Sequence, residues 1–238
     1  MNVGVPPNCY SGPASAGRVR LDLHAHSRYS PDSKLEPLEI VKVAKREGLD
    51  GIAITDHNAV EGARRAKGYA RSVGLLVIPA TEVSTREGHV LAYGVTEPIP
   101  RDQSVSKTVD DILAAGGVPV AAHPYRFWSG LGEARTVEAT FAAFEVQNAR
   151  TLRGGNLRAR ALADRQRVGS TGGSDAHFLG EIGRAVTIVE GASTEGEVLE
   201  ALRRGRTRAE GRDRGAAATV RYVTKAVAEW AGRGFKRI

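Results

Sequence analysis

The sequence contains almost no cysteine and no long hydrophobic run, and each absence excludes a class of protein. Cys9 is the only cysteine among 238 residues, so one chain can form neither a disulfide framework nor a zinc site built from thiolates. This cysteine usage favours a cytoplasmic protein, because disulfides persist in oxidising compartments. No apolar stretch approaches the roughly 20 residues that a membrane-spanning helix needs, so we expect no association with a membrane.

The first residues also lack the features of a targeting signal. Residues 1–17 are rich in Pro, Gly, Ser and Asn and have neither a charged start nor an apolar core. We interpret them as a flexible leader and residues 18–238 as one domain, a size that the length allows.

Short apolar runs alternate with segments of helical periodicity along the domain. The expected strands cover residues 19–26, 51–55, 75–78, 90–93, 118–122, 144–147, 168–171 and 185–189. The expected helices cover residues 35–47, 59–73, 106–115 and 156–166. This alternation predicts an α/β fold with a parallel sheet made of right-handed crossovers. About seven repeats suffice to close such a sheet into a barrel, whose chemistry lies at the carboxyl ends of the strands.

All six histidines fall at the ends of these expected strands. His24, His26, His57, His123 and His177 lie at or just beyond a carboxyl end, and His89 opens a strand. Residues i and i+2 of an extended backbone share a face, so the first two imidazoles can bind one ion. Three carboxylates occupy comparable positions: Asp32, Glu82 and Asp175. The pattern predicts that these nine side chains meet in one place.

The nine side chains have the chemistry of a metal cluster. Neutral imidazole and carboxylate groups suit manganese, zinc and iron(II). Nine ligands exceed what one ion can use, so we expect two or three divalent ions, with a carboxylate such as Glu82 as a bridge. Ions about 3.5–4 Å apart can share a hydroxide and stabilise an in-line displacement at phosphorus. The predicted nucleophile is therefore a metal-bound hydroxide, since bound water is acidified towards neutral pH.

The motifs resemble those of the PHP (polymerase and histidinol phosphatase) domain superfamily of metal-dependent phosphoesterases. Four motifs occur in the family's order: Asp22-Leu23-His24-Ala25-His26, Thr55-Asp56-His57, His123-Pro124 and Ser174-Asp175-Ala176-His177. Glu82 and His89 fall between the second and third motifs, where the family also has ligands. The resemblance covers about residues 19–190 and implies a distorted (β/α)7 TIM-like barrel with a trinuclear site in its mouth.

The resemblance also implies how the ligands are divided. The implied sets are His24, His26, Glu82 and Asp175 for one ion, Asp32, His57 and His177 for a second, and Glu82, His89 and His123 for a third. Asp32 departs from the pattern of members that have His there, and an oxygen ligand favours manganese or iron over zinc. Asp56 is interpreted as a residue that orients a ligand, with a turn-forming aspartate as the alternative.

Two arginines are candidates for binding the substrate. Arg126 follows the His123-Pro124 motif by two residues, and the resemblance implies that it binds substrate phosphate as a bidentate donor. Arg184, beyond the last motif, is the second candidate. We interpret Asn148 as an ordinary loop residue. The aromatic residues near the expected ligands are Tyr29, Tyr125, Phe127 and Trp128. These rings could stack on a base or simply line the pocket.

The positive charge of the chain lies near its end. The net charge is +7, yet residues 201–238 hold 11 Lys or Arg and 3 Asp or Glu, whereas the preceding 200 residues hold 23 and 24. Val220, Val223, Val227 and Trp230 recur at helical spacing, which predicts a basic helical extension packed on the barrel. A basic arm for nucleic acid and a surface-binding amphipathic helix are the alternatives.

We therefore predict a metal-dependent phosphoesterase that acts on nucleotides or on the 5′ ends of oligonucleotides, as an exonuclease or a nucleotide phosphatase. One alternative is a small-molecule phosphomonoesterase such as a histidinol phosphatase. Another, of a different class, is a catalytically silent metal-binding module, although all nine ligand positions are filled. The expected partner is a phosphate-ester substrate, either a nucleotide or a short single-stranded nucleic acid, with no obligate protein partner.

Overall fold

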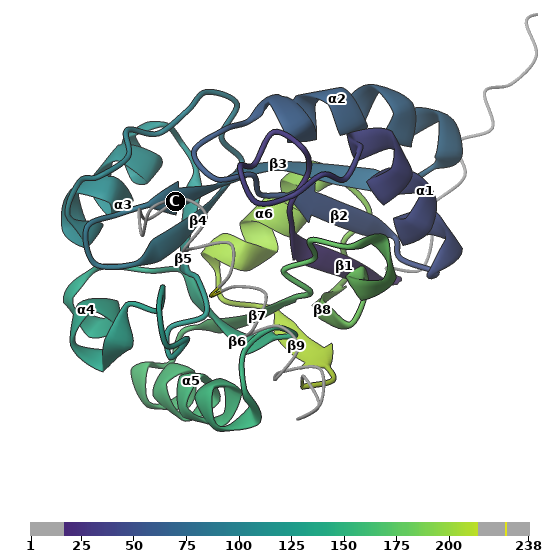
Figure 1. Cartoon of the computed structure of the whole chain (residues 1–238). Coiled ribbons are helices and arrows are strands. Elements are labelled where there is room, and N and C mark those ends of the chain that lie inside the picture. The colour runs from purple at the N-terminus through teal and green to yellow at the C-terminus, as the bar shows by residue number, and fades with distance from the viewer. Residues whose placement is uncertain (1–16, 214–226, 228–238) are drawn as a thin grey trace, which may run out of the picture.

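The computed structural model describes residues 17–213 and residue 227, and one mixed sheet organises this part of the chain (Figure 1). The nine strands are hydrogen-bonded in the order β7-β6-β5-β4-β3-β2-β1-β8-β9. Their bounds are β1 Arg18–Ala25, β2 Gly51–Ile54, β3 Leu76–Ser84, β4 His89–Tyr93, β5 Val118–Ala121, β6 Ala143–Asn148, β7 Gly169–Gly173, β8 Ala185–Glu190 and β9 Arg208–Gly211. The sheet curls until β7 contacts β1 and β8. The nearly closed sheet confirms the predicted distorted TIM-like barrel.

The sequence predicted a parallel sheet, but the sheet is mixed. Strand β4 is antiparallel to both β3 and β5, and β8 is antiparallel to β1 and β9. Only four residues, 85–88, separate β3 from β4, and a connection of that length allows a hairpin but no crossover. Strand β3 also runs on past the expected end at residue 78 to Ser84. Glu82 therefore lies inside a strand, paired with Leu91 of β4.

Helices cover the outside of the barrel and one of its ends. Their bounds are α1 Pro37–Arg46, α2 Glu61–Ala70, α3 Val105–Ala114, α4 Gly132–Glu138, α5 Arg153–Gln166 and α6 Glu195–Arg203. Four of them were predicted, whereas α4 and α6 were not. Figure 1 shows α1 and α2 beside β1–β3, and α3, α4 and α5 along the other half of the sheet. No helix in the described ranges is both long and apolar enough to cross a membrane.

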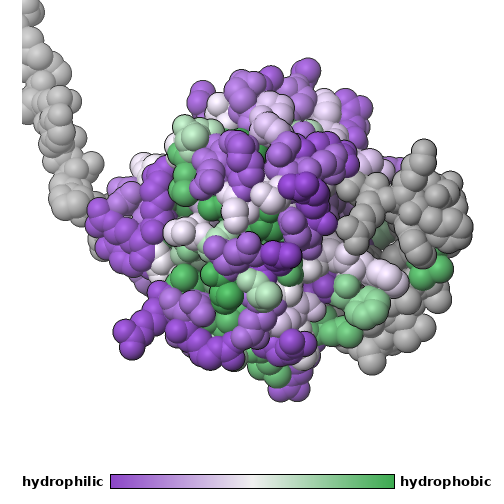
Figure 2. Space-filling model, turned by 90° about the vertical axis from the view of Figure 1, so that its left-hand side faces the viewer, coloured by the Kyte–Doolittle hydropathy of each residue, from purple (hydrophilic) through white to green (hydrophobic). Residues whose placement is uncertain are grey.

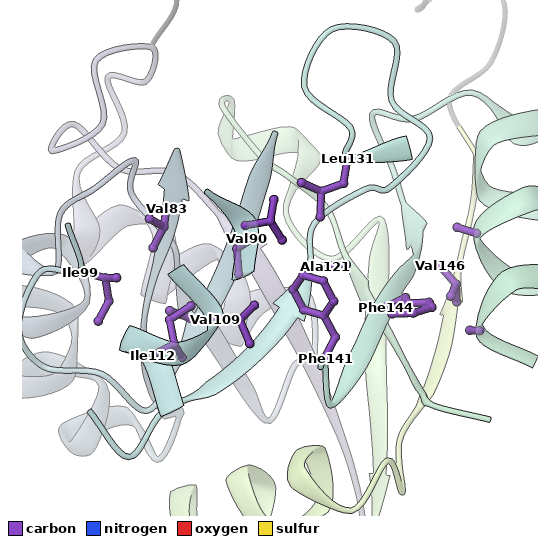
Figure 3. Close-up of a cluster of buried hydrophobic side chains, with 14 of the residues drawn as sticks. Val83, Val90, Ile99, Val109, Ile112, Ala121, Leu131, Phe141, Phe144 and Val146 are labelled. Carbon is purple, nitrogen blue, oxygen red and sulfur yellow. The ribbon is translucent and has the colours of Figure 1, made fainter. Parts of the chain in front are cut away.

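Three apolar clusters fill the space between these elements. The first joins α3 and α5 to strands β3–β6 and includes Val109, Ile112 and Phe144 (Figure 3). A second packs α1 and α2 on the outer face of the neighbouring strands. The third lies inside the barrel, where α6 packs on several strands. Tyr93 is buried there and donates its hydroxyl to the Leu23 carbonyl at 2.8 Å, so the barrel interior is a packed core.

The structure describes the expected leader and the expected basic extension only in part. Residues 1–16 of the expected leader lie outside the described residues, as does most of the expected helix over 216–231. Within the expected basic extension, residues 201–203 complete α6 and residues 208–211 form β9. The face in Figure 2 is largely hydrophilic, with hydrophobic side chains in small patches.

Candidate metal centre

The closure of the barrel brings the first and last motifs together. The Asp175 amide donates to the His24 carbonyl at 2.7 Å, and the His26 amide donates to the Ala176 carbonyl at 2.9 Å. Gly173 makes this approach possible, because a Cβ there would lie 2.3 Å from the Cβ of His24. Two motifs 150 residues apart therefore share one end of the barrel, which we call the mouth.

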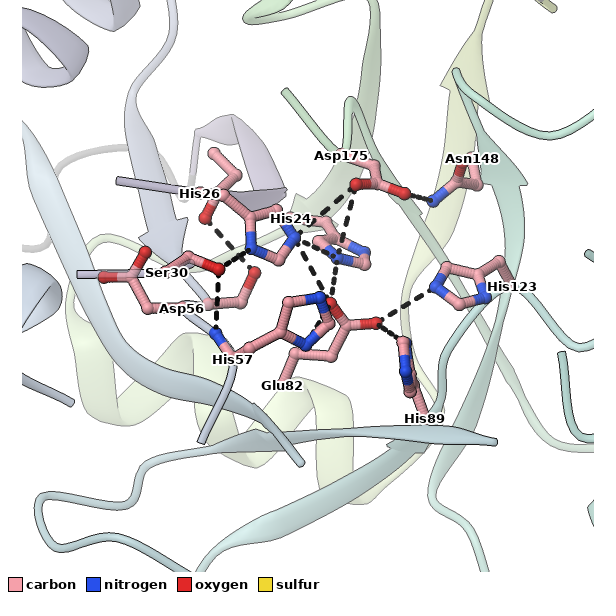
Figure 4. Close-up of polar contacts among 12 residues, drawn as sticks. His24, His26, Ser30, Asp56, His57, Glu82, His89, His123, Asn148 and Asp175 are labelled. Atoms are coloured by element: carbon pink, nitrogen blue, oxygen red, sulfur yellow. Dashed lines mark hydrogen bonds and ion pairs between the residues drawn. The ribbon is translucent and has the colours of Figure 1, made fainter. Parts of the chain in front are cut away.

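Glu82 lies at the centre of the polar residues in the mouth (Figure 4). Its Oε1 is 2.9 Å from His89 Nδ1 and 3.0 Å from His123 Nε2. Its Oε2 is 3.2 Å from the Nε2 atoms of both His24 and His26. The same oxygen lies 3.6 Å from Nδ1 of the fifth neighbouring imidazole, which belongs to His57. One carboxylate thus faces five imidazoles, two through one oxygen and three through the other.

Two further carboxylates extend the cluster. Asp175 Oδ1 lies 3.5 Å from His26 Nε2 and 3.9 Å from His24 Nε2. Asp32 Oδ2 lies 2.7 Å from His177 Nε2 and 3.7 Å from His57 Nε2. Each of the three ligand sets implied by the resemblance is therefore brought together in space. Their assignment to particular ions stays a prediction.

The potential donor atoms gather in overlapping groups. Among the described residues, four triads have their donor atoms within 4.8 Å of one another: His24, His26 and Glu82; His24, His123 and Asp175; His26, Asp32 and His177; His57, Glu82 and His89. All nine predicted ligands occur in these triads. Because the triads share members, the arrangement is a connected cluster and not a set of separate sites.

Burial and charge compete at the titratable groups of the cluster. Burial lowers the pKa of His26, but its hydrogen bonds to Asp175 and Glu82 outweigh burial and raise that pKa to about 10. Burial prevails at His57 and lowers its pKa to about 3. Burial alone would raise the pKa of Glu82, yet the surrounding histidines hold it well below its usual range. The neighbouring histidines and arginines also lower the pKa of Asp32 and Asp175, and a lowered pKa favours the negative form of a carboxylate, which attracts a cation.

Divalent metal ions fit this donor set. Bonds of about 2.0–2.2 Å to one ion place its ligand atoms roughly 3–3.5 Å apart, close to the distances around Glu82. The Nδ1 atoms of His57 and His123 are buried without a hydrogen-bond partner, and buried polar atoms rarely lack one unless an ion or water is bound. Burial lowers the pKa of both histidines, which keeps them in the neutral form that binds metal.

Glu145 is a part of the site that the sequence did not reveal. Its Oε1 lies 2.9 Å from His24 Nδ1, so it holds the ring of a ligand candidate from behind. Its Oε2 accepts from the His123 amide at 2.9 Å and from Asn148 Nδ2 at 3.1 Å. Such a carboxylate behind a histidine fixes the orientation of the ring. An ionisable residue within the expected strand 144–147 was the available signal, because a buried charge needs a partner.

Two arginines border the cluster at Asp175. Arg126 is mostly buried, and its Nη1 pairs with Asp175 Oδ2. Arg150, which the sequence did not single out, places Nη1 3.7 Å from Asp175 Oδ1 and donates to the Asp175 carbonyl at 3.3 Å. Asn148 also donates to Asp175 Oδ2, at 3.2 Å, so its interpretation as an ordinary loop residue was too simple. The pairing places Arg126 beside the cluster, and its phosphate-binding role stays a prediction.

The other two predicted site residues differ in position: the Asp56 carbonyl accepts from the Glu82 amide at 3.2 Å, whereas Arg184 lies away from the candidate ligands. Asp56 accepts from the backbone amide and the hydroxyl of Ser27, both at 2.6 Å, and so positions the loop after β1. Arg184 is exposed and donates from Nε to the Gly180 carbonyl at 3.1 Å. It lines a separate cavity of about 490 Å³ together with Arg20 and other residues, none of them a candidate ligand. The roles proposed for these two residues stay predictions.

Two candidate ligands have unusual backbone conformations. His123 has φ of 28° and Asp175 has φ of 53°, both in the left-handed region that non-glycine residues seldom adopt. Such conformations cost about 1–3 kcal/mol each and persist where surrounding contacts hold them. The contacts here are the Glu145 carboxylate at the His123 amide and the His24 carbonyl at the Asp175 amide. Positioning these two side chains at the mouth therefore lowers the folding stability of the protein.

Two family models match this chain, and their matches include most of the candidate ligands. The model of the PHP domain matches residues 22–143, about half of the chain, and that of the PHP-associated region matches residues 153–207. The first match contains seven of the nine candidate ligands, since only Asp175 and His177 lie beyond it.

Several known proteins are similar to this chain. An uncharacterised protein of Methanocaldococcus jannaschii is 35% identical over 55% of this chain and 82% of its own length. A 5′-3′ exoribonuclease of Haemophilus influenzae is 28% identical over 54% of this chain, but the match spans only 51% of the exoribonuclease. Among solved structures, a two-domain protein from Bacteroides vulgatus, described as containing a predicted PHP-like metal-dependent phosphoesterase, has a TM-score of 0.67 at 20% identity. That match covers 83% of this chain and 66% of the other, and it supports the fold.

Proposed function

The chain belongs to the PHP domain family of metal-dependent phosphoesterases, and we propose that it hydrolyses phosphate esters at the cluster around Glu82. The observation that supports this proposal most directly is the position of Glu82 between five imidazoles. A carboxylate so placed suits the bridging of two ions. Bound divalent ions supply an acidified water molecule and neutralise charge on the phosphoryl oxygens.

The residues of the chain contribute positioning and charge. Glu145 keeps the His24 ring facing the cluster and holds the His123 backbone in its left-handed conformation. Arg126 and Arg150 place guanidinium groups beside Asp175. Guanidinium groups bind phosphate oxygens in bidentate fashion, so these two arginines would orient the ester and stabilise charge that develops on it.

We propose nucleotides or the 5′ ends of oligonucleotides as the substrates. The similarity to an exoribonuclease supports this substrate class, and so does the excess of 11 basic over 3 acidic residues in 201–238. We also propose manganese or iron as the metal, because Asp32 supplies an oxygen ligand. The single cysteine supports a cytoplasmic location.

Metal analysis combined with a substrate panel tests the proposal. The panel contains nucleoside monophosphates, nucleoside 3′,5′-bisphosphates, 5′-phosphorylated oligonucleotides and histidinol phosphate. We expect two or three divalent ions per chain and phosphate release from nucleotides or oligonucleotides. The Glu82→Gln variant should lose this activity, whereas Glu97→Gln, at an exposed surface position, should keep it.

Each other result would contradict part of the proposal. Hydrolysis of histidinol phosphate alone would identify a small-molecule phosphomonoesterase. A protein that binds its ions after manganese, iron or zinc reconstitution but cleaves nothing in the panel would be a silent metal-binding module.

A further inference from the structure

Two consecutive aromatic residues near the mouth are unusually exposed. Phe127 has 85% and Trp128 69% of its surface accessible, more than any other large apolar residue in the described part of the chain. Their ring centroids lie 4.7 Å apart with the planes at 82°. Exposing two large rings forgoes the favourable burial that drives folding, and such patches commonly mark a binding surface.

Backbone hydrogen bonds hold this aromatic pair on a defined loop. The Arg126 amide donates to the His123 carbonyl at 2.9 Å, and the Gly130 amide donates to the Arg126 carbonyl at 3.0 Å. The following carbonyl, of Ser129, accepts from the His89 amide at 3.2 Å. Gly130 permits this tight loop, because a Cβ there would lie 2.5 Å from the Pro124 carbonyl. Hydrogen bonds therefore connect the loop that carries the pair to the backbones of His123 and His89, two candidate ligands.

The charged groups beside Phe127 and Trp128 indicate what kind of molecule the two rings bind. Arg126 immediately precedes Phe127 and turns its guanidinium to Asp175 in the cluster. A metal cluster and an arginine select a phosphate group, whereas exposed rings select a flat apolar one. The molecule that combines both groups within a short distance is a nucleotide, whose base can stack on aromatic side chains irrespective of its sequence.

We infer that Phe127 and Trp128 form a stacking platform for the base of the nucleotide whose phosphate is bound at the cluster. This inference rests on the proposed function and adds to it the residues that recognise the base. Arg126 lies between His123, a candidate ligand, and Phe127 in the sequence, so one loop contacts both the phosphate and the base. Removing a stacking ring typically weakens binding by about 5- to 150-fold.

A matched pair of substrates tests the platform by kinetics. Adenosine 5′-monophosphate and ribose 5-phosphate present the same phosphate and sugar and differ in the base. For the wild-type enzyme we expect KM to be about 5- to 150-fold lower for the nucleotide. The double variant Phe127→Ala/Trp128→Ala should remove that difference and leave kcat within about twofold. The single conservative variant Trp128→Phe should keep most of the KM difference between the two substrates. The control variant Leu157→Ala, at an exposed position on α5, should leave both KM values unchanged.

Tryptophan fluorescence gives a readout that does not depend on turnover. The chain has two tryptophans, so Trp230→Phe leaves Trp128 as the only one. With the metal ions bound, a non-hydrolysable phosphonate analogue of adenosine 5′-monophosphate should quench this fluorescence, and the matching analogue of ribose 5-phosphate should not.

The possible outcomes separate the inference from the proposed function. If the wild-type enzyme hydrolyses neither ester and only the nucleotide analogue quenches the fluorescence, the platform is supported. The same result contradicts the proposed activity on these esters. Hydrolysis of both with the same KM before and after the double substitution overturns the platform and leaves the phosphoesterase intact. A double variant that changes only the oligomeric state would show that the rings contact a second copy of the chain, which also overturns the inference.

Discussion

The two ends of the barrel are built from opposite kinds of side chain. At the mouth, Glu82 and eight other histidines and carboxylates are buried or half-buried. At the opposite end, which we call the base, α6 packs Val198 and Leu202 into the apolar cluster of the barrel interior. Leu199 of the same helix lies so close to Gly94, the residue after β4, that a Cβ there would be 3.2 Å from its Cδ1. Arg203 donates to the Gly116 carbonyl at 2.9 Å, just before β5.

Backbone conformation and capping differ between the two ends in the same way. Two candidate ligands at the mouth, His123 and Asp175, have left-handed backbones. At the base the left-handed residue Arg167 is an ordinary helix C-cap of α5, and α6 begins with a complete capping box formed by Thr194 and Glu197. The mouth therefore contains groups that are costly to bury, and the base contains ordinary stabilising contacts. Barrels of this kind commonly separate chemistry and stability between their two ends. Substitutions at one end should change activity, and substitutions at the other should change stability.

The largest effect is expected from Glu82→Gln at the mouth. An amide cannot bridge two cations as a carboxylate does, so kcat/KM should fall by about 10³-fold or more, beyond the 10- to 100-fold typical of residues that orient a ligand. Steady-state kinetics and metal analysis would measure the change. A variant with normal metal content and near-normal kcat/KM would show that Glu82 is not the bridging residue.

The largest effect at the base is expected from Leu202→Ala. The side chain is fully buried, and truncating a buried leucine costs about 2–5 kcal/mol. Chemical denaturation should show this loss of stability, while metal content and activity per folded molecule stay unchanged. Loss of metal in the folded variant would contradict the separation of the two ends.

A smaller effect at the mouth is expected from Glu145→Gln. The variant keeps the shape of the side chain but weakens its contact with His24 Nδ1, so metal affinity should fall by about 10- to 100-fold. Titration with manganese under chelator competition would measure the affinity. Raising the manganese concentration should restore turnover, as expected for a positioning residue; activity that stays low at saturating metal would contradict this role.

The smallest effect is expected from Thr194→Ala at the base. The Thr194 hydroxyl accepts from the Glu197 amide at 3.3 Å, and the loss of such a cap costs about 1 kcal/mol. Thermal unfolding should register the change, and Thr194→Ser should largely avoid it. An alanine variant as stable as the wild type would show that the capping box contributes nothing measurable.

The sequence predicted most of the mouth and little of the base. The histidines are recognisable because they recur at the ends of apolar runs, and these ends meet in a barrel. The helix α6 was missed, although Thr194 and Glu197 have the spacing of a capping box. Strand β4 was expected to be parallel, because the preceding strand was expected to end at residue 78; the short connection at 85–88 that makes a hairpin became apparent only with the true end of β3 at Ser84. These errors arose where several local patterns were compatible with the same residues.

The sequence by itself determined the kind of chemistry, because residue types and their order define the donor set. The tertiary structure decided which of those residues meet. It placed Glu82 between five imidazoles, Glu145 behind His24, and Arg184 in a separate cavity. The physical reason is that these contacts join residues up to about 150 positions apart. Their distances depend on the length of β3, the antiparallel pairing of β4 and the closure of β7 on β1, which no local pattern specifies.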